Sequence, residues 1–66
     1  MARHAAYKTF SPDQRREVFK ALVEAQDGGL GVVRSRKEIA QRFSLSDRQL
    51  RRIEQEGVDA DWPPLG

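Results

Sequence analysis

Residues Arg36–Gln55, RKEIAQRFSLSDRQLRRIEQ, decide the fold of this chain. Apolar residues recur there at helical spacing in two short runs, which predicts two amphipathic helices. The two runs consist of Ile39, Ala40 and Phe43, and then of Leu50 and Ile53. Only Ser44-Leu45-Ser46 separates the runs. Two helices joined by such a short turn are typical of the helix-turn-helix, whose second helix enters the major groove of DNA.

The second predicted helix carries a polar face roughly opposite its apolar face. Side chains turn by about 100° per residue on a helix, so positions three, four and seven apart share a face. Four residues have this spacing, and we call them the arginine row: Arg48, Arg51, Arg52 and Gln55. The row is suited to phosphates and base edges. The alternatives are that Arg51 and Arg52 are solvated surface arginines or that they pair with Glu54 and Glu56, and exposed pairs of that kind contribute little.

Three Ser-x-x-Glu/Gln patterns predict where helices begin, because this pattern is typical of the capping box. The pairs are Ser11 with Gln14, Ser35 with Glu38, and Ser46 with Gln49. Pro12 also suits the first position of a helix, which we expect to run to about Gln26.

Glycines predict where the helices end. Gly28-Gly29 closes the first helix, residues 30–33 form a connector, and Gly57 closes the third helix. The predicted fold class is therefore all-α, with three principal helices forming a helix-turn-helix domain over residues 11–57. A flexible basic arm precedes it at residues 1–10. A tail follows at residues 58–66, and we expect its Val58, Trp62 and Leu65 to fold back on the core.

Composition limits the classes of function. The chain has 66 residues, no cysteine and one histidine, His4. These counts predict one small domain without a disulfide, a metal site or a cofactor, and offer no base–nucleophile pair for an enzyme. No apolar run approaches the roughly 18 residues of a membrane span. We expect a cytoplasmic, nucleoid-associated protein.

Charge is distributed unevenly along the chain. The net charge is +2 overall, but +3 over residues 1–16, −2 over 17–33, +3 over 34–56 and −2 over 57–66. Two positive zones on a nearly neutral chain indicate an anionic partner that binds in one orientation. Ordinary solvated helix faces give the same pattern.

The segment Glu38–Pro64 resembles the promoter-reading C-terminal region of bacterial RNA polymerase sigma factors. The motif EIAQRFSLSDRQLRRIE carries the resemblance. It implies that Ser46 caps the recognition helix and that Leu50 and Ile53 pack in the core. The contacts with DNA that it implies are Asp47, Arg48, Gln49, Arg51, Arg52 and Gln55.

The chain departs from that family at residues 57–62, which are acidic where sigma factors are basic. It also has Ser44 at a turn position where many helix-turn-helix motifs prefer glycine. The other domains of a sigma factor have no counterpart here. We therefore expect a stand-alone promoter-reading module or a small repressor built on the same motif.

The function predicted from the sequence is binding of specific sites on double-stranded DNA in transcriptional regulation. Residues 47–56 would enter the major groove, and Ser46 at the start of that helix is a further predicted contact with DNA, while Ser35 and Arg36 approach the phosphates. In the basic arm, Arg3 and Lys8 offer a contact with the minor groove. The alternative is a small adaptor that docks on RNA polymerase or another protein through Trp62 and Leu65.

Overall fold

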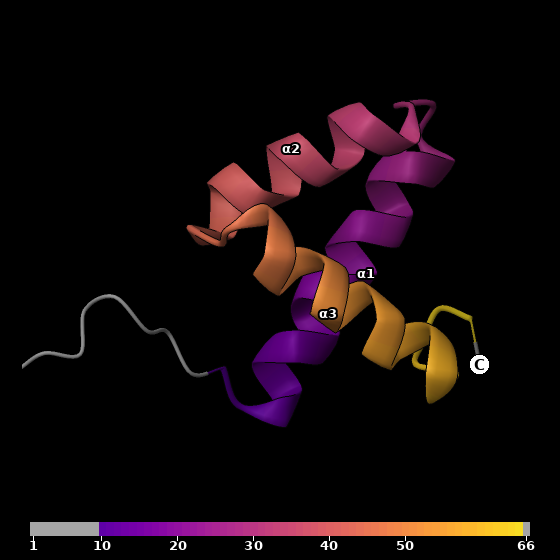
Figure 1. The fold of residues 1–66 in the computed structure, drawn as a ribbon. Coiled ribbons are helices and arrows are strands. Elements are labelled where there is room, and N and C mark those ends of the chain that lie inside the picture. The colour runs from indigo at the N-terminus through magenta and orange to yellow at the C-terminus, as the bar shows by residue number, and fades with distance from the viewer. Residues whose placement is uncertain (1–9, 66) are drawn as a thin grey trace, which may run out of the picture.

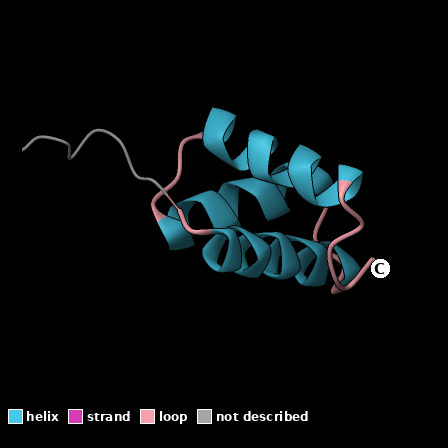
Figure 2. Ribbon diagram, turned by 90° about the horizontal axis from the view of Figure 1, so that it is seen from below, coloured by secondary structure: helices cyan, strands magenta, loops and turns pink. Residues whose placement is uncertain are grey.

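A computed structural model describes residues 10–65 and contains three helices: α1 (Pro12–Asp27), α2 (Val32–Phe43) and α3 (Asp47–Asp59). The predicted all-α class is confirmed. Helices α2 and α3 both pack against α1, and α3 crosses in front of it in Figure 1. Short loops join the helices (Figure 2). Helix α3 therefore has one side on the core and the other facing outward.

A small apolar core holds the three helices together. Its buried side chains are Val18, Phe19, Leu22, Ile39, Leu45, Leu50, Ile53 and Trp62. Every helix contributes to this set, and Leu45 adds to it from the turn between α2 and α3. Burial of these apolar surfaces is the main force that fixes which face of α3 points outward.

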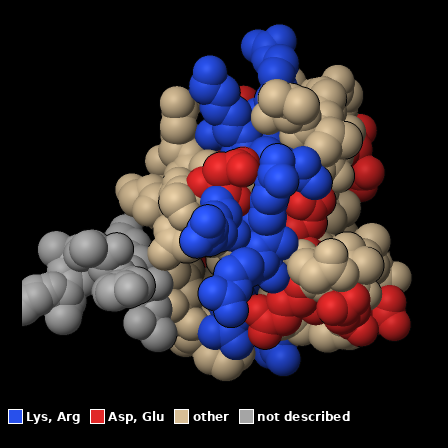
Figure 3. All heavy atoms as spheres, viewed as in Figure 1, with Lys and Arg blue, Asp and Glu red and all other residues tan. Residues whose placement is uncertain are grey.

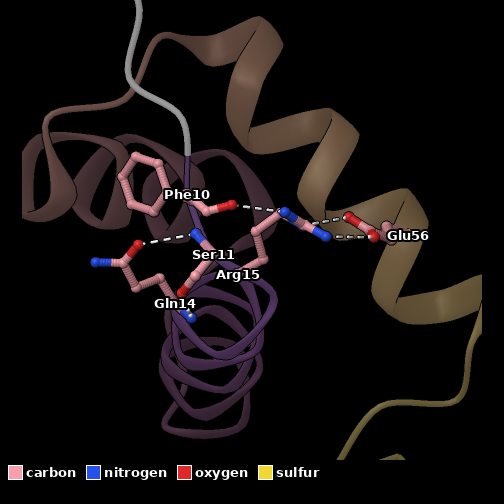
Figure 4. Close-up of polar contacts among 5 residues, drawn as sticks. All are labelled: Phe10, Ser11, Gln14, Arg15 and Glu56. Carbon is pink, nitrogen blue, oxygen red and sulfur yellow. Dashed lines mark hydrogen bonds and ion pairs between the residues drawn. The ribbon is translucent and has the colours of Figure 1, made fainter.

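Helices α1 and α3 begin with the predicted capping boxes. The backbone N–H of Gln14 donates to Ser11 Oγ at 3.2 Å, and Ser11 N–H donates to Gln14 Oε1 at 2.8 Å (Figure 4). Ser46 and Gln49 form the same pair of bonds, at 3.1 and 2.9 Å. These bonds satisfy N–H groups that the helix itself leaves without acceptors.

The predicted start of α2 is wrong. The helix begins at Val32, three residues before Ser35, and Gly31 occupies the cap position without a side-chain bond. Ser35 is fully buried, and its hydroxyl donates to the carbonyl of Gly31 at 2.8 Å. A serine inside a helix can bond the carbonyl four residues earlier in this way, so it no longer needs the cap position. The expected connector at residues 30–33 is consequently shorter, because Val32 and Val33 are helical.

All three helices end in the same hydrogen-bonded turn. In each turn a backbone N–H donates to the carbonyl five residues earlier: Leu30 to Ala25, Leu45 to Ala40 and Trp62 to Gly57. The residue before each donor has a positive φ, and these residues are Gly29, Ser44 and Asp61. This is the Schellman motif, whose last residue is commonly apolar. It delivers Leu45 and Trp62 into the core.

The predicted end of α3 at Gly57 is also wrong, because the helix continues to Asp59. Gly57 is buried, and a Cβ built on it would lie 2.3 Å from Cδ1 of Phe19. Glycine is needed here for close approach of α3 to α1, rather than for termination of the helix.

The tail closes the core through Trp62. The rings of Trp62 and Phe19 meet edge to face, with centroids 6.0 Å apart, and the Arg16 guanidinium lies 5.7 Å from the Trp62 centroid. The expectation that Trp62 covers the core is confirmed. The same expectation is wrong for Val58 and Leu65, which remain 49% and 52% exposed.

Candidate nucleic-acid interface

The outward face of α3 carries the arginine row. Arg48, Arg51, Arg52 and Gln55 are all exposed, whereas Leu50 and Ile53 are buried. The predicted division of this helix into a packing face and a polar face is thus confirmed. Together with Asp47, the row lines a shallow groove of about 400 Å³. Figure 3 shows a band of lysine and arginine side chains across the face on which α3 lies.

The turn between α2 and α3 determines the residue at which α3 begins. Ser44 takes the left-handed conformation, with φ of 57°, although it carries a side chain. Ser46 then caps α3. Both the Ser46 hydroxyl and the Gln49 side-chain oxygen accept bonds in the capping box. These two predicted contact residues therefore set the start of α3.

Arg51 pairs with Asp47 along α3, with Nε 3.1 Å from Oδ2. Both side chains are more than 60% exposed. An exposed pair of this kind contributes at most about 1 kcal/mol, so a phosphate can displace the carboxylate at little cost. Asp47 also lies in the first turn of α3, where the helix dipole favours a negative charge.

Arg48 and Arg52 lie one helical turn apart and, unlike Arg51, have no acidic partner on α3. Within residues 10–65, no carboxylate forms an ion pair with either guanidinium. Their positive charges are therefore not offset by a direct partner. Beside them, Gln55 donates from Nε2 to Asp59 Oδ1 at 3.0 Å.

Two glutamates of α3 are held by the other helices. Glu54 accepts from Arg36 of α2 at 3.0 Å, and Glu56 accepts from two nitrogens of Arg15 of α1 at 2.9 and 3.2 Å (Figure 4). The alternative pairing of Glu54 and Glu56 with the arginine row is therefore wrong. Spacing along one helix allowed that pairing, and no local signal marked the two partners on α1 and α2.

The structure brings together five of the nine residues predicted to contact DNA: Asp47, Arg48, Arg51, Arg52 and Gln55. Ser46 and Gln49 lie next to them in the cap of α3. The other two differ from the prediction. Ser35 is buried inside α2, and Arg36 is 27% exposed in its pair with Glu54. Arg15 was not singled out from the sequence. Its guanidinium donates to Glu56 and, from Nη1, to the carbonyl oxygen of Phe10 at 2.6 Å.

The structure bears on the predicted protein-binding tail but not on the basic arm. Trp62 is 8% exposed and Leu65 is 52% exposed, so the two side chains do not form one exposed patch. Arg3, His4 and Lys8 lie outside the described residues.

Comparisons with known proteins assign no family. No protein-family model matches the chain, and no curated protein or solved structure is similar enough to count as a relative. Across the described residues, no helix is long and apolar enough to cross a membrane. Nor do three or more potential metal-ligating side chains come together in this part of the chain.

Proposed function

We propose that this protein binds double-stranded DNA and that the outer face of α3 lies in the major groove. The observation that carries the proposal is the position of Arg48 and Arg52. Both guanidinium groups are exposed on a helix that follows a three-residue turn, and no carboxylate pairs with them among residues 10–65. Arginine binds phosphate oxygens and the O6 and N7 atoms of guanine through the same planar set of donors.

The ion pairs that join α3 to its neighbours support the proposal. Arg36 and Arg15 hold Glu54 and Glu56, so these two acidic groups are largely neutralised beside the arginine row. A helix that approaches phosphates benefits when its own carboxylates are already paired, since like charges repel. Regulation of transcription at specific promoter sites is the role that we propose for this binding.

Ser35 has no part in the proposed interface, because its hydroxyl is buried. Contacts to the phosphate backbone fall instead to Lys37 of α2 and Arg51 of α3, which line the groove between these two helices. An adaptor role through Trp62 and Leu65 has less support, because Trp62 would have to leave the core before a partner could contact it.

Gel-shift titration with pooled genomic duplex fragments tests the proposal. We expect the double variant Arg48→Ala/Arg52→Ala to bind at least about tenfold more weakly than the wild type, which corresponds to about 1.4 kcal/mol. Lys20→Glu is the matched control, because it lowers the net charge by the same two units at an exposed position of α1. The proposal fails if the double variant and the control bind equally well.

A further inference from the structure

Charge separates sharply within the folded part of the chain. Residues 32–53 hold seven lysines or arginines and two acidic residues, whereas residues 54–65 hold four acidic residues and no basic one. Figure 3 shows acidic side chains gathered beside the end of the basic band. The molecule therefore presents a positive surface and a negative surface on the same small domain, and opposite potentials of this kind favour association.

The positive surface contains a groove between α2 and the start of α3. It has a volume of about 490 Å³, and Val33, Ala40 and Leu45 contribute its apolar lining. Lys37 and Arg51 line it as well, together with Asp47, the carboxylate partner of Arg51. Val33 is 77% exposed, the highest exposure among the large apolar side chains of the described residues. An exposed valine beside cations is suited to a partner that brings both an apolar side chain and carboxylates.

The negative surface has this complementary composition. At the end of α3 and in the tail, Asp59 and Asp61 are exposed, and Leu65 is 52% exposed. No ion pair within the described part of the chain involves either aspartate. The two surfaces therefore have opposite charges, and each has an exposed apolar side chain.

We propose that the chain binds a second copy of itself, with the acidic end of one copy docked in the α2–α3 groove of the other. Two reciprocal contacts would close a twofold dimer, and a single repeated contact would build an open chain. The surfaces are small, so the association belongs to the weak, transient class. This proposal does not depend on DNA binding, since both surfaces and their charges exist in the free chain.

Sedimentation equilibrium of the full chain without DNA tests the proposal through a charge exchange. Lys37→Glu replaces one positive charge of the groove by a negative charge, and Asp59→Lys makes the opposite change at the acidic end. We expect each variant alone to associate at least about tenfold more weakly than the wild type. An equimolar mixture should regain association, because the Lys37→Glu chain keeps an intact acidic end for the intact groove of its partner.

Two controls make the same charge changes on exposed positions of α1: Lys20→Glu and Glu17→Lys. Both should associate like the wild type. Raising salt from about 0.1 M to about 1 M shortens the screening length from about 10 Å to about 3 Å and should dissociate the wild type. Melting by circular dichroism verifies that every variant is folded.

Three results would overturn this proposal. The first is a wild type that stays monomeric at about 0.1 M salt and about 1 mM chain, where a contact with a millimolar Kd would be populated. The second is association of both variants at wild-type strength. The third is a mixture that associates no better than its separate components, which would show that the two surfaces do not meet.

Discussion

Two small residues have roles that their local sequence does not indicate. Gly57 lets the Phe19 ring lie against the backbone of α3, and Ser35 is fully buried, with its hydroxyl bonded to the carbonyl of Gly31. Sequence patterns assigned both residues to helix ends, because glycine is common after a helix and serine before one. Their actual roles depend on a neighbouring helix, which local patterns do not contain.

Gly57→Ala should destabilise the domain even though alanine is the better helix former. The added Cβ would overlap Phe19, and overpacking of this kind costs about 1–3 kcal/mol, against a gain of about 0.5–1 kcal/mol in helix propensity. Thermal melting by circular dichroism measures the loss. In a Phe19→Leu background the penalty should shrink, since the ring that the Cβ meets is gone. An equal penalty in both backgrounds would contradict the proposed contact.

Arg51 and Arg52 should differ in how they contribute to DNA binding. They point about 100° apart on α3, and only Arg51 has a carboxylate partner among residues 10–65, Asp47. We expect Arg52→Ala to relax the preference at one base pair, a loss of about 1–3 kcal/mol of discrimination, and Arg51→Ala to weaken all sequences alike. Selection from random duplexes by each variant measures this. Unchanged preference and affinity in both variants would remove α3 as the recognition helix.

The elements were largely predictable because their signals are local. Capping boxes at Ser11 and Ser46 and the apolar spacing of Leu50 and Ile53 each lie within a few residues, and the structure confirms them. The start of α2 was not predictable in this way. Val32 and Val33 ahead of Ser35 are exposed, while Ser35 itself is buried and its hydroxyl bonds the carbonyl of Gly31, so the Ser-x-x-Glu pattern lies one turn inside the helix instead of at its start.

The two faces of α3 should respond very differently to truncation. Leu50 is fully buried, so Leu50→Ala should cost about 2–5 kcal/mol and unfold much of a domain this small. Gln55 is exposed, and Gln55→Ala should stay within about 0.5 kcal/mol of the wild type. Circular dichroism melts compare the two variants. Equal melting temperatures would mean that the facing of α3 is misassigned.

In the whole molecule, the candidate site depends on helical periodicity within α3 and on ion pairs between residues far apart in the sequence. The arginine row follows from helical periodicity and was visible in the sequence. The pairs Arg15–Glu56 and Arg36–Glu54 were not, because they join residues 41 and 18 positions apart. These pairs determine which charges stay free near α3, so the electrostatics of the face required the fold.

The salt dependence of duplex binding is the decisive measurement for DNA binding by the outer face of α3. Fluorescence anisotropy with a labelled duplex, taken from the fragments that the protein retains, gives the affinity over a range of salt concentrations. If the α3 face contacts about four to six phosphates, log affinity should fall against log salt with a slope of about −4 to −5. Arg48→Ala should make the slope shallower by about 1 if this guanidinium meets a phosphate. A flat salt response, or no binding to pooled genomic fragments at low salt, would contradict the account.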